Sequence, residues 1–517
     1  MLAVQLPRIQ QELASKALAR LESAIDGRLE VGEILIQPFN AVMLKDVNII
    51  DNNPLKETPI PGWEPVDTLF HADIITATLK LSNLIKTEGL HLGRVTLDGG
   101  SMHLVIEDGE YPTNLARIFR IVEKEHERIE KGNIFDASKI RVKDFRYRMS
   151  DAAKPHRPND GSFINWQDLD LRAQLRGHSL RLSKSRVSGV VDNLTAVEKC
   201  GYRISRASGR ARVGMGKTEI TNLHLTDLWS DLRIESYTMN YDYSKAFSKY
   251  ISDVKMGLKI RKGSILSFKS MHAYMGVFPG NEAVLLLDKG SASGYVNDLK
   301  VEDLKFIDPD SGIRGSLSCS LLGLPDIQNL AFEATLKDFN ATTAGFDRAF
   351  RIWTSGQAPG VSSYAPGRSM TLNASARGNL RKMDISLSLG SRIGSLKARA
   401  DIRNLLNPSQ GLDIRGNVST RDLNLGVILD ASALGAVSLE SGLKAHLKKG
   451  ENSVTIDSLK VSRLGALGYD YTNIAATGSF SGTSFDGKVI CDDPNLNFLF
   501  QGIFNLSGKT SNALYKL

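Results

Sequence analysis

The residues that come closest to a catalytic motif run from Ala211 to Thr218, and they fit a permissive nucleotide P-loop pattern. In a true P-loop a buried strand precedes the glycines and a helix N-terminus follows them, so that backbone N–H groups cradle phosphate. Here residues 203–210 are polar and basic, and residues 219–225 alternate as in a strand. The sequence therefore predicts that Lys217 lies in a strand and binds no nucleotide.

Other reactive residue types are not arranged as a site. The nine histidines include no HExxH motif and no cluster with cysteines, so we expect no metal. Cys200, Cys319 and Cys491 are far apart and form no CxxC pair, and we expect Cys319 and Cys491 to be packed thiols. The acidic run at residues 308–312 is typical of a turn. We therefore expect no catalytic residue, no cofactor and no enzymatic activity.

Basic residues are frequent in the segments 141–148, 172–186 and 203–217, where Phe145 and Tyr147 alternate with arginines. Such residues could contact phosphates and stack on bases, or could attract anionic lipid headgroups. They could also form only a solvated outer face. The net charge of +8 favours an anionic neighbour without choosing among these interpretations, and the charges look scattered along the chain.

The dominant pattern after Lys139 is strict alternation of apolar and polar residues, as in 313–321, 383–389 and 396–402. A period of two gives each strand one apolar and one wet face. Few helical segments are available to cover the apolar face. A second sheet, a sheet curling on itself or a bound apolar ligand must cover it instead. The predicted fold class is therefore mostly β, with a long curved antiparallel sheet that forms an elongated hydrophobic groove.

The remaining elements follow from helical periodicity and turn residues. We expect an N-terminal helix within residues 1–26, a second helix at 115–130, and short helices at 243–251, 344–352 and 425–434. Hairpins are predicted between 443–447 and 454–456, and between 474–480 and 485–491. The Gly-, Ser- and Pro-rich segment 355–367 is a linker or loop. It separates β-groove segments expected at 27–138, 139–354 and 368–517.

Three groups of residues resemble AsmA-like and TamB-like proteins, the translocation and assembly module family. The first is the opening of the chain, with Leu6-Pro7-Arg8-Ile9-Gln10, residues 27–34 and residues 44–51. The second lies at residues 294–299, 315–317, 323–326 and 342–343, and the third at 474–478, 485–489 and 492–496. The resemblance covers nearly the whole chain, although each motif is a loose pattern of strand and turn.

The resemblance implies a Gram-negative cell-envelope protein, anchored in the inner membrane and extending through the periplasm. It implies a groove that carries phospholipid toward the outer membrane. It also implies a role in outer-membrane protein assembly and secretion with an outer-membrane β-barrel partner. This chain contains no run of about 18 apolar residues, and it stops at Leu517 without the C-terminal domain of TamB proteins. It therefore looks like the N-terminal part of a longer protein whose membrane anchor is missing.

The expected partners are phospholipids, the inner membrane and an outer-membrane barrel, with no nucleic acid. Two alternatives stay open: a scaffold for outer-membrane barrels that works by strand addition, and a tandem β-sandwich that binds polyanions. The side chains predicted to line the lipid groove are Leu169, Leu171, Leu175, Ile385, Leu387, Leu389, Leu396, Ile402, Leu412, Ile414, Val454, Ile456, Phe485 and Val489.

Overall fold

The computed structural model describes residues 25–37, 41–56, 66–79, 90–108, 111–119, 133–154, 160–183, 186–214, 216–242, 249–354, 362, 369–405, 411–448, 451–482, 484–505 and 515–516. The chain divides into two compact units. Unit 1 comprises Met1–Gly280 with Ser293–Val296, and unit 2 comprises Asn281–Ala292 with Asn297–Leu517. This division near residue 280 differs from the segments expected from the sequence. The predicted N-terminal helix and most of the predicted linker lie outside the described residues.

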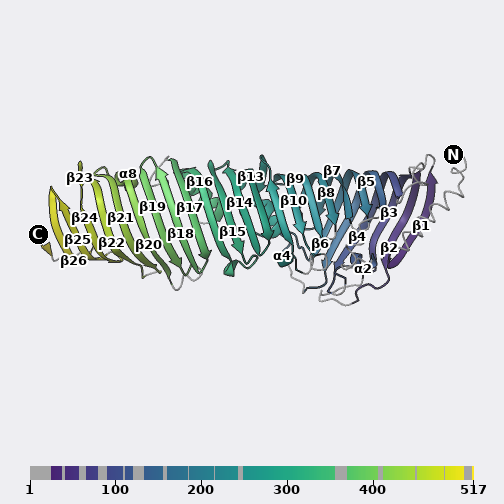
Figure 1. The fold of residues 1–517 in the computed structure, drawn as a ribbon, viewed down its shortest axis with the longest axis horizontal. Helices are drawn as coiled ribbons and strands as arrows, with labels where there is room; N and C mark the ends of the chain where they lie inside the picture. Colours follow the sequence, from purple (N-terminus) through teal and green to yellow (C-terminus); the bar gives the residue numbers. More distant parts are fainter. Residues whose placement is uncertain are drawn as a thin grey trace. The chain divides into compact units, whose positions relative to one another are not determined.

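Unit 1 is a layer of strands in which most strands pair with their neighbours in the chain, while β12 pairs with β10 (Figure 1). Its strands are β1 (Gly27–Gln37), β2 (Ala41–Asp51), β3 (Thr68–Leu79), β4 (Leu90–Ile106), β5 (Asn133–Asp151), β6 (Asp168–Ser183), β7 (Arg186–Glu198), β8 (Arg203–Gly214), β9 (Lys217–Asp227), β10 (Asp231–Asn240), β11 (Lys255–Ile260) and β12 (Ser264–Ser267). Its described helices are α2 (Asn114–Ile118), α4 (Tyr250–Asp253) and α5 (Phe268–Met275).

Unit 2 has the same plan, with successive strands lying side by side (Figure 1). The strands are β13 (Val284–Tyr295, its last residues in unit 1), β14 (Asp298–Asp308), β15 (Ile313–Leu322), β16 (Ala331–Thr342), β17 (Ser369–Asn379), β18 (Lys382–Ser391), β19 (Gly394–Arg403), β20 (Leu412–Asn424), β21 (Leu434–Leu447), β22 (Ser453–Ala466), β23 (Tyr469–Tyr471), β24 (Ile474–Ser481), β25 (Ser484–Asp493), β26 (Leu496–Asn505) and β27 (Tyr515–Lys516). The helices are the 3₁₀ turn η4 (Ile327–Asn329), α6 (Thr343–Thr354) and α8 (Leu425–Ile428).

The predicted fold class is confirmed, because the chain is mostly β with a long sheet and only short helices. One detail is corrected: β4 and β5 pair in parallel, so the sheet is mixed rather than purely antiparallel. The reason is the crossover through α2, which returns the chain to the edge from which β4 started. Neighbour-to-neighbour pairing within one layer also excludes the tandem β-sandwich, in which two sheets share a core.

Both predicted hairpins are confirmed in register. Leu443 lies opposite Ile456 across β21 and β22, and Phe480 lies opposite Phe485 across β24 and β25. The helix predictions are confirmed in part. The structure has α6 where 344–352 was expected, and shorter helices at the start of 425–434 and at the end of 243–251. Of the helix predicted at 115–130, the described part is α2, and residues beyond 119 lie outside the description.

The helix α2 is fixed to unit 1 by packing and by buried charge. The Thr113 hydroxyl accepts a hydrogen bond from the Ala116 N–H at 3.0 Å, which caps the helix. Ala116 and Ile118 are fully buried, while Arg117 forms ion pairs with the buried carboxylates of Asp51 and Glu107. A guanidinium that bridges two buried carboxylates satisfies charges that would otherwise be costly to desolvate.

In unit 1, strands β2, β5 and β9 run in the same direction and each ends in a buried aspartate. Asp51 accepts a hydrogen bond from the Asn53 N–H at 2.9 Å, and Asp151 accepts one from the Ala153 N–H at 3.1 Å. In unit 2 the buried Asp308 caps a turn in the same way, as the sequence predicted. Side-chain acceptors at strand ends hold the turns that the sheet needs.

The third aspartate, Asp227, also anchors α5. One of its oxygens accepts hydrogen bonds from the N–H groups of Trp229 and Ser230 at 2.7 and 2.6 Å and from the Ser270 hydroxyl at 2.9 Å. Its other oxygen accepts the Tyr202 hydroxyl at 2.9 Å. Because Ser270 belongs to α5, this network joins the end of β9 to the helix.

We predict that Asp227→Ala lowers the stability of unit 1 by about 3 kcal/mol, because the buried donors on Ser230 and Tyr202 and the partly buried N–H of Trp229 lose their acceptor. The control is Asp192→Ala, which removes an exposed carboxylate 3.0 Å from His178 and should change stability by less than about 0.5 kcal/mol. Thermal or urea unfolding of both variants checks this. Equal effects of the two substitutions would contradict the anchoring role.

We also predict a pH dependence carried by His103. Burial, with a smaller effect of Arg148, lowers the pKa of His103 from 6.5 to about 4. The unfolded chain takes up this proton below pH 6.5, whereas the folded chain does so only near pH 4. Stability is therefore lost as the pH falls through this window, by up to about 3 kcal/mol. In His103→Gln, unfolding measured across the window should lose this component of its slope; an unchanged slope would contradict the assignment.

Candidate functional site

The side chains of unit 2 sort onto two faces because of the strand register. Leu387 of β18 lies directly opposite Ala374 of β17 and Ala398 of β19, and Ala398 lies opposite Val418 of β20. Directly opposite residues in an antiparallel pair point to the same face. One apolar row therefore crosses four consecutive strands, and parallel rows run through Ile385 and through Leu389.

The predicted lining residues of unit 2 all belong to this face, which we call the apolar face of unit 2. Register relates each of them to its neighbours on adjoining strands, so the structure brings together side chains far apart in sequence. The members are Ile385, Leu387, Leu389, Leu396, Ile402, Leu412, Ile414, Val454, Ile456, Phe485 and Val489. Their role as lipid contacts stays a prediction.

The apolar face of unit 2 is only half covered. Ile385, Leu387, Leu389 and Leu396 are neither buried nor fully exposed, which is unusual for large apolar side chains in the middle of a sheet. The helix α6 covers only one end, where Phe346 contacts Phe339 with ring centroids 6.3 Å apart. Among the described residues of unit 2, no second sheet packs against this face. Such an apolar surface is typical of a binding site.

In unit 1 the three predicted lining residues have different surroundings. Leu175 is half-buried between Val142 of β5 and Leu194 of β7. Leu169 is only 6% exposed and packs in a cluster with Ile164 and Tyr202, against which Leu171 also lies. Leu169 is therefore a core residue rather than an open lining residue.

The cover over Leu169 consists of α5 and the segment before β6. The Ile164 N–H donates to the Ala273 carbonyl at 2.9 Å, and the Trp166 indole N–H donates to the Tyr274 carbonyl at 3.0 Å. The sequence prediction missed α5. Its signals were Ser267, whose hydroxyl caps the helix, and Gly276, which ends it in a left-handed conformation.

Two tyrosines on the apolar face of unit 1 are largely buried. Burial raises the pKa of Tyr147 to about 12, because the phenolate would lose its hydration there. Burial also raises the pKa of Tyr237, on the same face of β10, well above its ordinary value. Both shifts follow from burial of the phenol groups, which disfavours their charged form.

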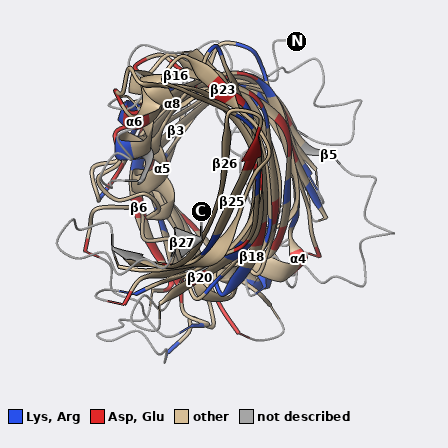
Figure 2. Ribbon diagram, turned by 90° about the vertical axis from the view of Figure 1, so that its left-hand side faces the viewer, with Lys and Arg blue, Asp and Glu red and all other residues tan. Residues whose placement is uncertain are grey.

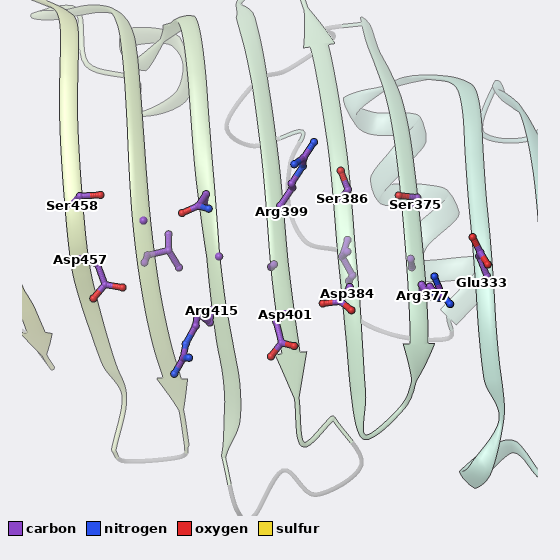
Figure 3. A pocket seen from close by; sticks show the side chains of 17 residues that line it. Glu333, Ser375, Arg377, Asp384, Ser386, Arg399, Asp401, Arg415, Asp457 and Ser458 are labelled. Atoms are coloured by element: carbon purple, nitrogen blue, oxygen red, sulfur yellow. The ribbon is translucent and has the colours of Figure 1, made fainter.

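The opposite face of unit 2 holds a depression of about 740 Å³ whose polar lining comes from adjacent strands (Figure 3). Its charged residues include three arginines, Arg377, Arg399 and Arg415, and four carboxylates, Glu333, Asp384, Asp401 and Asp457. Basic and acidic groups are therefore mixed, and the depression lacks the excess of positive charge that a polyanion site needs. This surface is a solvated outer face.

The P-loop-like segment is a hairpin. Gly214 ends β8 and Lys217 begins β9, and the predicted strand at 219–225 is confirmed within β9. The Lys217 ammonium lies 3.9 Å from the Glu219 carboxylate. No helix N-terminus follows the glycines, so backbone N–H groups are not gathered around a phosphate position.

Other kinds of site were sought among the described residues. They include no group of three or more His, Cys, Asp or Glu side chains placed to hold a metal ion. Cys200, Cys319 and Cys491 are free thiols. Cys491 is fully buried, as expected for a packed thiol, whereas Cys319 is only half-buried. No helix in the described part of the chain is long and apolar enough to cross a membrane.

Comparison with known proteins gave no match to a family model, to a curated protein or to a solved structure. The resemblance to AsmA-like and TamB-like proteins therefore stays a prediction from the sequence. The functional argument rests on the geometry of the two faces.

We predict that Lys217→Ala leaves nucleotide binding unchanged from the wild-type background level, because Lys217 is a strand residue. Equilibrium binding of a fluorescent ATP analogue to both proteins measures this. Binding by the wild type that the substitution abolishes would show that the hairpin does hold phosphate.

Proposed function

We propose that this chain binds phospholipid acyl chains along the apolar face of unit 2. The supporting observation is the set of half-exposed leucine and isoleucine side chains on consecutive strands that no described element of unit 2 covers. An acyl chain laid across the strands would cover several rows. Each methylene removed from water contributes about 0.8 kcal/mol, so a bound lipid would stabilise a face that is otherwise partly wet.

The direction of the apolar rows suits transport as well as storage. Neighbouring strands are about 4.8 Å apart, and each row repeats an apolar side chain at that spacing. No charged side chain interrupts the row through Ala374, Leu387, Ala398 and Val418. A lipid tail can therefore move from strand to strand without crossing an ion, while its headgroup stays in water.

The wider setting of this proposal comes from the sequence resemblance. We propose a periplasmic protein of a Gram-negative envelope, associated with the inner membrane, that passes phospholipid between the inner and outer membranes. A contribution to outer-membrane protein assembly with a barrel partner belongs to the same proposal. The half-open apolar face supports the lipid part most directly.

The test is Leu387→Asp, which places a carboxylate in the middle of an apolar row. Desolvating that charge against a lipid tail costs several kcal/mol, so copurified phospholipid should fall severalfold. The matched control is Ser388→Asp, one residue along β18, on the opposite polar face between Asn373 and Lys397. It should leave bound lipid unchanged.

Lipid extraction with mass spectrometry measures the bound phospholipid, and circular dichroism checks that both variants keep their β content. Equal lipid in the two folded variants would contradict binding on the apolar face. Absence of phospholipid from the wild-type protein would favour a scaffold for barrel assembly instead.

A further inference from the structure

The net positive charge of the chain is concentrated in unit 1. Residues 133–214, which form β5 to β8, contain 17 Lys and Arg against 8 Asp and Glu, whereas the whole chain has a net charge of +8. The rest of the chain is therefore close to neutral, and the charges are not scattered as the sequence first suggested. In Figure 2, blue Lys and Arg segments lie together with red Asp and Glu segments on the strands beside the β5 label.

The register of β5 and β6 places arginines directly opposite one another. Arg141 lies opposite Arg176, and Arg146 lies opposite Arg172. Like charges in directly opposite positions are destabilising. Only Arg146 of these four has an ion-pair partner among the described residues, Asp170, at 2.5 Å. Apart from the ion pair at Arg146, no described carboxylate neutralises the repulsion between these opposite arginines.

More arginines share this polar face. In β8, Arg203 lies opposite Val197, which lies opposite Arg172, and Arg210 belongs to the row of His178 and Val190. Arg141, Arg172, Arg176, Arg203 and Arg210 are all exposed, and none forms an ion pair within the described part of the chain. We call Arg141, Arg172, Arg176, Arg203 and Arg210 the arginine face.

Unit 2 provides an internal contrast. On its polar face like charges also lie opposite one another, at Lys382 and Arg403 and at Arg415 and Lys444. Carboxylates lie beside these cations: Asp401 forms ion pairs with Lys382 and Arg403, and Asp457 forms one with Lys444. Like-charge pairs therefore occur in both units, but in unit 2 neighbouring carboxylates form ion pairs with the basic side chains. The arginine face is a local property of β5 to β8.

We propose that the arginine face docks this protein onto a membrane surface of anionic phospholipid headgroups. Guanidinium groups recognise phosphate through several N–H donors in a fixed plane. Arg141 and Arg176 lie on neighbouring strands, about 4.8 Å apart, and Arg172 lies about 13 Å from Arg176 along β6. Arg203 lies two strands from Arg172, so the groups spread in two dimensions. Headgroup phosphates also form a two-dimensional array, whereas a nucleic-acid backbone presents a single line of charge.

The position of the aromatic side chains argues in the same direction. Single-stranded nucleic-acid binders stack bases on aromatic rings next to their basic groups. Phe145 and Tyr147 alternate with arginines in sequence, but the structure turns them to the apolar face, where Phe145 contacts Phe70 with ring centroids 6.1 Å apart and Tyr147 packs against the cluster around Leu169. The arginine face therefore offers phosphate contacts without base stacking.

The docking surface is separate from the proposed lipid site, since it lies on the polar face and in unit 1. Attraction to an anionic membrane surface is worth about 1 kcal/mol per basic side chain, or about fivefold in partitioning. Replacing Arg141, Arg172 and Arg176 together by Gln should therefore weaken binding about 100-fold. The effect should shrink as ionic strength rises, because the Debye length shortens.

The experiment is sedimentation of the full chain with vesicles of phosphatidylglycerol and phosphatidylcholine, and with vesicles of phosphatidylcholine alone. The wild type should bind only the anionic vesicles. The triple variant Arg141→Gln, Arg172→Gln, Arg176→Gln should lose this binding. The matched control, Arg377→Gln, Arg399→Gln, Arg415→Gln, removes the same charge from the polar face of unit 2 and should stay within about twofold of wild type.

A second triple variant, with Lys at residues 141, 172 and 176, keeps the charge and should retain most of the binding. The Gln variant should be at least as stable as wild type, because the repulsion between opposite arginines is removed, and it should keep its copurified phospholipid. Failure of wild-type binding, or equal loss in the unit 2 control, would overturn the proposal. So would tighter binding to a single-stranded oligonucleotide than to the anionic vesicles at the same salt.

Discussion

Most described strands of this chain separate apolar from polar side chains, and in neither unit does a described second sheet cover the apolar face. This single constraint fixes the register of each strand pair, since any slip by one residue would move leucines such as Leu387 and Leu396 into water. It also explains why the large apolar residues of unit 2 are half-buried rather than packed in a core. The fold leaves one extended apolar surface partly exposed to water.

The helices cover the apolar face only near the ends of strands. In unit 1, α2 and α5 each follow a strand that ends at the edge of the sheet where β2, β5 and β9 also end. In unit 2, α6 and α8 each follow a strand that ends at the edge where β14 and β25 also end. At these edges buried acceptors such as Asp227 and Asp308 hold the turns. In unit 1, α4 lies at the opposite edge, after β10, where the Tyr250 hydroxyl lies 3.4 Å from the Met256 sulfur. The apolar face is therefore covered near the strand ends and left half-open toward the middle of the strands.

Much of this could be predicted from the sequence, because a period of two and clear turn residues define strands and hairpins. The face shared by Ile385, Leu387 and Leu389 follows from alternation and antiparallel pairing alone. The parallel pair β4 and β5 could not be predicted, because the alternation within a strand does not indicate whether it pairs with its neighbour in parallel or antiparallel. The burial of Leu169 depends on α5. This helix is short and begins directly after a strand, so its sequence shows no long helical periodicity. The arginine face was visible as basic segments, but the opposition of Arg141 and Arg176 required the register.

The neighbour-to-neighbour pairing of the strands has a consequence for folding and for resistance to force. The stability of each strand depends mainly on the two strands beside it, so folding is cooperative along the sheet as in a linear array of coupled repeats. Loops such as that between Phe480 and Phe485 close over few residues, and folding can start at any such hairpin and propagate in both directions. Tension applied to the ends of unit 2 would act on its edge strands first. The sheet would then yield by unzipping one ladder at a time, while the strands still paired keep their register.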